Sequence, residues 1–250
     1  MKIWIEHPTQ PVMLILAWQA PDEFRDEDRR RWEVGAIYQS DDQVMFRYFG
    51  EPEFGHRNFG RTLQKLRDYG FEGYPAFKFE PDRTFDKDVI ETFNRRLPPK
   101  SRADFGRYLD YFSIPPEADL SAFQLLGITE ARLPGDGFSL IDPLDPEMET
   151  GEVAFEIAGY RHESPDLAPA VGQHLTLEAE PTNTWDENAV AVYIGTSRIG
   201  FVNKIQAPVV CNWLDSREIE CRLLRYNGRQ GAPRAYALLR IAARNGRLAA

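Results

Sequence analysis

The sequence predicts an α+β protein with a mixed α+β domain over residues 1–150 and a small β-barrel domain over residues 151–250. The length of 250 residues suits one large or two modest domains, and 42% hydrophobic residues suffice for sizeable cores. Strand-like and helix-like patterns mix in the first part, whereas the second contains short strands and one helix. The second part also holds 11 Lys+Arg and 11 Asp+Glu, so the whole net charge of −9 arises in the first part. This difference suggests separate functions for the two domains.

Strands are expected near the start of the chain. The apolar run at 11–18 predicts a buried strand, and the segment 31–49 predicts two strands joined by a Ser-Asp-Asp turn. Residues 51–60 are rich in glycine and aromatic side chains, which predicts a loop and, as one interpretation, a surface that docks a protein. Most of the aromatic residues crowded between 46 and 85 are expected in the core.

Helix-like periodicity recurs in four later segments, at residues 61–71, 86–97, 101–112 and 115–128. Their expected N-terminal caps are Asp86 or Asp88, Ser101, and Asp119 or Ser121. Turns and one short strand follow and form the expected linker, which ends near Gly151.

The second part contains six strand-like segments, at residues 152–161, 173–181, 189–195, 197–203, 219–228 and 234–244. Between the fourth and fifth, residues 204–215 predict a short helix. Several short strands with one helix are typical of a small barrel.

Several classes of function find no support. No apolar run approaches the roughly 18–20 residues that cross a bilayer, and the first residues make a poor signal peptide. We therefore expect a cytoplasmic protein without membrane contact. Cys211 and Cys221 are interpreted as small buried side chains. The four histidines are scattered, and the Gly-Asp-Gly turn near residue 136 lacks a Walker lysine, so we expect neither metal nor cofactor.

Trp185 and Asp186 stand in a polar run between two predicted strands. The indole could serve as a stacking platform for a base, and the carboxylate could accept a hydrogen bond from a terminal sugar hydroxyl. Alternatively, Asp186 and the nearby asparagines are turn formers that bond to adjacent backbone N–H groups. Both interpretations remain open at this point.

Arginines are the second nucleic-acid signal. Residues 221–250 hold seven arginines and no acid, which suits either a groove along a phosphate backbone or a solvated strand face. Arg161, Lys204 and Arg225 are the expected phosphate contacts, although an isolated arginine such as Arg161 is often simply a surface residue. Tyr226, beside an Asn-Gly turn, could stack on a base or pack on its own strands.

Residues 152–245 resemble the HIRAN domain. The resemblance rests on the opening strand "FEIAGYRH", the segment "EPTNTWDENAVAV" and the later "LLRYNG". It implies an OB-like barrel that captures single-stranded DNA, especially at a free 3′ end. The matching positions for DNA contacts are Arg161, His162, Trp185, Asp186, Asn203 or Lys204, and Tyr226. His162 stands where the family has a tyrosine, which weakens stacking there.

Residues 14–143 resemble the N-terminal subdomain of HipA-type kinases, in the segments "EVGAIYQSDDQVMFRYF", "DVIETFNRRLPPKSR" and "FQLLGITEARLPGDGFSLIDP". In that family the subdomain is regulatory and docks partners. No kinase catalytic loop or Asp-Phe-Gly motif follows in this sequence, so phosphoryl transfer is not carried over.

Together these observations predict a non-enzymatic adaptor of bacterial type. Its barrel would bind single-stranded DNA or DNA ends, and its first domain would dock a protein, for instance a HipA-type kinase. The domain pairing suggests toxin–antitoxin regulation, genome maintenance or phage defence, by analogy alone. Two alternatives remain. One is an antitoxin-like module that binds only protein, which the acidic charge favours. The other is a metal-dependent nuclease component using acids such as Glu178, Glu180 and Asp186.

Overall fold

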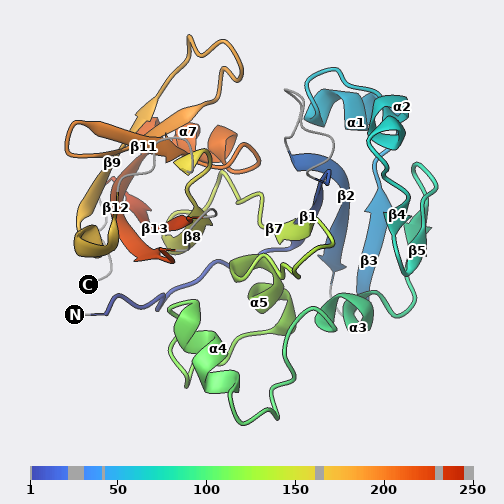
Figure 1. Cartoon of the computed structure of the whole chain (residues 1–250), viewed down its shortest axis with the longest axis horizontal. Helices are drawn as coiled ribbons and strands as arrows, with labels where there is room; N and C mark the ends of the chain where they lie inside the picture. Colours follow the sequence, from blue (N-terminus) through green and yellow to red (C-terminus); the bar gives the residue numbers. More distant parts are fainter. Residues whose placement is uncertain (1, 22–30, 41–42, 161–165, 229–232, 245–250) are drawn as a thin grey trace. The chain divides into compact units, whose positions relative to one another are not determined.

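The computed structural model describes residues 2–21, 31–40, 43–160, 166–228 and 233–244. The chain forms two compact units, each shown in Figure 1. The sheet unit comprises Gln10–Arg102 and Leu120–Asp142, and the barrel unit comprises Met1–Thr9, Ala103–Asp119 and Pro143–Ala250. The barrel unit thus takes three segments from the first 150 residues: Met1–Thr9, Ala103–Asp119 and the start of Pro143–Ala250.

The sheet unit is built on a five-stranded antiparallel sheet in the order β6-β3-β2-β1-β7. The strands are β1 (Met13–Gln19), β2 (Arg31–Ser40), β3 (Gln43–Tyr48), β6 (Thr84–Phe85) and β7 (Phe138–Ile141). The first three confirm the predicted strands, and Ser40 pairs with Gln43 across the predicted turn. A small hairpin of β4 (Gly73–Tyr74) and β5 (Phe77–Lys78) lies outside this sheet.

The loop predicted at residues 51–60 is wrong, because helix α1 (Glu51–Arg57) occupies most of it. Glycines suggested a loop, but Pro52 in the first turn and acids there, with His56 and Arg57 in the last turn, favour a helix. Phe54 is fully buried, whereas Phe59 is 45% exposed. Any docking surface in this segment would therefore have to use Phe59 rather than its whole aromatic set.

The other predicted helices are present but shorter than expected: α2 (Leu63–Asp68), α3 (Val89–Asn94), α4 (Phe105–Tyr111) and α5 (Ala122–Ile128). Ser121 caps α5 in a capping box with Gln124. Asp88 stands at the cap of α3 without a side-chain hydrogen bond, because its backbone is left-handed (φ 53°). Asp104, rather than Ser101, precedes α4.

Aromatic side chains form the core of the sheet unit, as predicted. Phe46, Tyr48, Phe77 and Phe93 are buried and pack through ring contacts of 4.6–5.8 Å between centroids. The Tyr48 hydroxyl donates to the Phe77 carbonyl at 2.7 Å, and burial raises the pKa of Tyr48 to about 12. The hydroxyl is therefore buried but hydrogen-bonded, as a polar atom in a core requires.

The barrel unit is a six-stranded antiparallel sheet that curls on itself, in the order β11-β10-β9-β12-β13-β8. Its strands are β8 (Gly151–Glu156), β9 (His174–Ala179), β10 (Val190–Ile194), β11 (Ser197–Phe201), β12 (Arg217–Tyr226) and β13 (Ala235–Ala243). The 3-10 turn η1 (Ala168–Ala170) precedes β9, and helix α7 (Ala207–Ser216) precedes β12. All six strands and the helix confirm the sequence prediction of a small β domain.

One isolated bridge joins the two edges of the curled sheet. Ala158, just after β8, exchanges two backbone hydrogen bonds of 2.8 Å with Phe201 on β11. Gly200 makes this approach possible, since an added Cβ would lie 2.4 Å from the Ala158 carbonyl oxygen. The interior is filled by apolar side chains, with Trp213 of α7 fully buried and donating to the Pro146 carbonyl at 3.2 Å.

Two buried side chains explain why distant segments join the barrel unit. The carboxylate of Glu152 on β8 accepts backbone N–H groups of Glu6 and His7 and pairs with Arg240 at 2.7 Å. Arg225 on β12 holds the α4 segment through contacts described below. Local periodicity carries no signal for such pairings. No helix in the described ranges is both long enough and apolar enough to cross a membrane.

Candidate nucleic-acid interface

The loop between β9 and β10 is fixed by its own polar side chains. At the base of the loop, the backbone N–H of Glu180 donates a hydrogen bond of 2.8 Å to the Ala189 carbonyl. Within it, Asn183 Oδ1 accepts the N–H groups of Trp185 (2.9 Å) and Asp186 (3.3 Å). Asn183 Nδ2 donates to Glu180 Oε2 at 2.8 Å. The backbone that carries the indole is therefore ordered before any ligand arrives.

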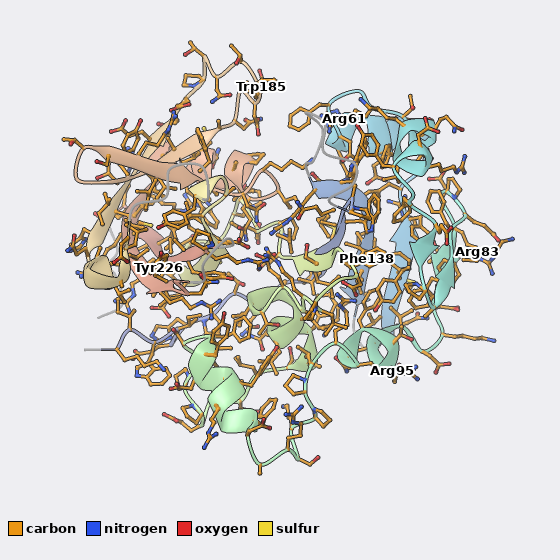
Figure 2. The ribbon with its side chains drawn as sticks, in the orientation of Figure 1. Arg61, Arg83, Arg95, Phe138, Trp185 and Tyr226 are labelled. Atoms are coloured by element: carbon orange, nitrogen blue, oxygen red, sulfur yellow. The ribbon has the colours of Figure 1, made fainter. Side chains whose placement is uncertain are left out.

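Trp185 is 65% exposed, on the loop that projects from the barrel unit in Figure 2. The neighbouring Asp186 accepts the N–H of Asn188 through Oδ1 at 2.9 Å. Its other carboxylate oxygen has no hydrogen bond to a described residue. The turn that the second interpretation predicted is therefore present, and it leaves the indole exposed. Contact with a base or a sugar hydroxyl stays a prediction.

The outer face of β9, β10 and β11 adjoins this loop. Tyr193 on β10 pairs with Arg198 on β11, so their side chains share one face. The Arg198 guanidinium lies 5.1 Å from the ring centre of Phe201 and 3.6 Å from Glu180, measured from Nη1 to Oε1. Sequence analysis missed these three residues. The sequence signal for them was the alternation of inward-facing and outward-facing residues along the hairpin around Gly195. Using that signal also requires the register of β10 with β11.

The two predicted DNA-contact residues after β11, Asn203 and Lys204, differ in their surroundings. Asn203 is buried, its Oδ1 accepts the Ile205 N–H at 2.9 Å, and its Nδ2 donates to Gln206 at 3.1 Å. These hydrogen bonds engage the Asn203 side-chain amide in the turn that leads into α7, so this side chain stabilises the local fold. Lys204 is half-buried at the same turn and keeps its predicted role as a phosphate contact.

Arg225 and Tyr226 point to opposite faces of β12. Tyr226 pairs with Ala235, which is fully buried, and its ring meets that of Tyr160 edge-on at 5.9 Å. Burial and the neighbouring Tyr226 raise the pKa of Tyr160. Arg225 pairs with Tyr236 on the outer face instead. The two side chains therefore lie on different faces of the strand, and their predicted DNA contacts stay predictions.

The Arg225 guanidinium is enclosed by three rings. Its central carbon lies 3.8 Å from the ring centre of Tyr236, 4.4 Å from Tyr111 and 4.7 Å from Phe112. Nη1 donates to the Tyr111 carbonyl, while Nε is buried without a hydrogen bond to a described residue. Burial lowers the pKa of Arg225. This half-buried arginine connects the α4 segment to the barrel, and its predicted phosphate contact stays a prediction.

Two further arginines of this region, Arg222 and Arg234, lie beside acidic side chains. Arg222 pairs with Glu220 at 2.6 Å and donates to the Gly172 carbonyl at 3.1 Å. Arg234 lies 3.7 Å from Glu156. Arg161 and His162 fall outside the described residues, so their predicted contacts stay predictions. The arginine-rich end therefore supplies less open positive surface than its composition indicated.

Acidic residues surround the β9–β10 loop. Glu178, Glu180, Asp186 and Glu187 come from it or from the end of β9, and Arg198 lies 3.6 Å from Glu180. Across the described residues, no group of three or more His, Cys, Asp or Glu side chains is arranged to hold a metal ion. Ligand recognition here would consequently depend on stacking and hydrogen bonding more than on net positive charge.

No protein-family model matches the chain, and no curated protein matches it. Among solved structures, the chain is similar to the crystal structure of the HIRAN domain of human HLTF. That similarity has a TM-score of 0.33 and 18% sequence identity, and it covers 38% of this chain and 78% of the other. We draw no conclusion from a structural likeness of this size.

Proposed function

We propose that the barrel unit binds single-stranded DNA through stacking on Trp185. The observation that carries the proposal is a 65% exposed indole on a loop whose backbone is already ordered by Asn183. An exposed aromatic ring contributes roughly 1–3 kcal/mol for each base that stacks on it. Because the ordering cost of the loop is met by its own hydrogen bonds, more of that energy is available for binding.

The acidic surroundings favour the end of a strand over its interior. Asp186 has a carboxylate oxygen able to accept a hydrogen bond from a terminal 3′-hydroxyl. A phosphodiester or 3′-phosphate at that point would instead place negative charge beside Asp186 and Glu187. We therefore propose a preference for free 3′ ends.

Fluorescence polarisation of labelled oligonucleotides tests both parts. We expect binding to a free 3′-hydroxyl end, weaker binding to a 3′-phosphate end, and little binding to a blunt duplex. Trp185→Ala should weaken binding roughly fivefold or more, and Trp185→Phe should retain most of it, since the ring is kept. Val171→Ala, which truncates another exposed apolar side chain of the same unit, should have no effect.

The outcomes are distinguishable. Equal affinity for all single-stranded ends would remove the end preference and leave strand binding intact. An unchanged affinity in Trp185→Ala, or no binding to any oligonucleotide at low ionic strength, would contradict the proposed function itself.

The wider role remains the adaptor inferred from the sequence: a chain without catalysis of its own, whose sheet unit docks a protein partner. A second candidate is an interaction module that binds only protein. The enclosed Arg225 and the paired Arg222 favour it, because they reduce the surface available to phosphates. The two candidates are separated by the same titration, since a protein-only module would bind no oligonucleotide even at low salt.

A further inference from the structure

Arg198 lies on the outer face of the barrel, beside Glu180 at the base of the Trp185 loop. It extends from β11 on the outer face, with Phe201 under its guanidinium at 5.1 Å and Tyr193 opposite it on β10. A chain of side-chain contacts connects it to the loop: Arg198 meets Glu180 at 3.6 Å, and Glu180 accepts from Asn183 at 2.8 Å. Asn183 in turn fixes the backbone of Trp185.

We infer that Arg198 is a phosphate-binding residue and that Glu180 holds its place until a strand arrives. This inference rests on the proposed function and names a contact that neither the sequence nor the HIRAN resemblance indicated. The strand would stack one base on Trp185 and present a neighbouring phosphate to Arg198. Glu180 would then release the guanidinium while keeping its bond to Asn183, because its two oxygens serve different partners.

The geometry of the ion pair makes this exchange favourable. The contact between Nη1 and Oε1 is long, at 3.6 Å, and the Arg198 side chain is 42% exposed, so the pair is weak. A phosphate offers two oxygens to the planar guanidinium and forms shorter, charge-assisted hydrogen bonds. Stacking on Phe201 already restrains the guanidinium, which reduces the side-chain entropy lost on binding.

Arg234 provides a matched control on the same barrel. Its side chain is also 42% exposed, and it makes a similarly long pair with Glu156, at 3.7 Å. Removing either arginine changes the net charge equally and breaks one comparable ion pair. Only Arg198 lies on the face that adjoins the Trp185 loop.

The experiment measures affinity for a single-stranded oligonucleotide against salt concentration in the full chain. Arg198→Ala should weaken binding about fivefold and make the slope of log affinity against log salt shallower by about 0.7, the value for one lost single-strand phosphate contact. Arg198→Lys should restore most of the slope. Glu180→Gln should tighten binding about twofold to fivefold, because Gln still accepts from Asn183 but no longer competes for Arg198.

Arg234→Ala should leave the slope unchanged. The inference is overturned if Arg198→Ala and Arg234→Ala behave alike, or if Glu180→Gln weakens binding. In that case a Trp185→Ala loss would still support the proposed function, whereas an unchanged Trp185→Ala affinity would contradict the function and not Arg198 alone. Circular dichroism of each variant establishes that the fold is retained.

Discussion

Two groups of aromatic and polar side chains in the barrel unit, around Trp185 and around Arg225, were both predicted to contact DNA. They differ in which side chain they leave exposed to solvent. In the β9–β10 loop, hydrogen bonds from Asn183 fix the backbone and leave the Trp185 ring in solvent. Around Arg225, three rings enclose the guanidinium, so the polar group faces its own chain. A basic or aromatic residue is therefore a candidate for ligand binding only where the fold leaves its side chain exposed to solvent. The residue type alone is not sufficient.

The largest expected effect concerns the enclosed group. Arg225→Ala removes contacts to three rings and leaves a space beneath the α4 segment, so we expect a loss of about 2–4 kcal/mol in the free energy of unfolding. Urea unfolding followed by circular dichroism measures it. Oligonucleotide affinity, measured where the variant is still folded, should not fall, since Arg225 does not reach a ligand.

Arg225→Met sharpens the same comparison. Met keeps most of the stem volume without the charge, and burial of that charge is itself costly, as the lowered pKa of Arg225 indicates. We expect a stability between those of the wild-type protein and Arg225→Ala. If Arg225→Ala proved as stable as wild type and bound DNA more weakly, the enclosed group would be a binding site after all and the contrast would fail.

Sequence alone predicted most of the barrel and one of its two aromatic–polar groups. Strand alternation and glycine turns are local signals, so all six strands and α7 were predicted. The surroundings of Arg225 and Tyr226 could not be predicted, because neighbouring residues on a strand face opposite ways and the register shifts between Leu223 and Arg225. Two of the three rings around Arg225, those of Tyr111 and Phe112, come from over a hundred residues away in the chain. No local pattern encodes that contact.

The loop was more predictable for a physical reason. The side chains of Asn183 and Asp186 accept backbone N–H groups two or three positions away, so their spacing carries the information. The exposure of Trp185 follows from the short closed loop. By contrast, the role proposed for Arg198 needs the register of β10 with β11 and the approach of Glu180, which are tertiary features.

An intermediate effect is expected in the loop itself. Asn183→Ala removes the acceptor of two backbone N–H groups, so we expect about 1 kcal/mol of lost stability, as for a lost helix cap. DNA affinity should also fall, by less than in Trp185→Ala, because the ring remains but its backbone is no longer fixed. Thr184→Ala, an exposed neighbour in the same loop, is the control and should change neither. Unaltered affinity in Asn183→Ala would show that the ordered backbone is irrelevant to binding.

The smallest effect on stability is expected at Trp185. A ring that is 65% exposed contributes little to the folded state, so Trp185→Ala should change the free energy of unfolding by less than about 0.5 kcal/mol. Thermal and urea unfolding of the full chain measure it directly. A loss well above 1 kcal/mol would mean that the indole stabilises its own chain as Arg225 does. The distinction between an open and an enclosed group would then disappear, and with it the reason to place a nucleotide on Trp185.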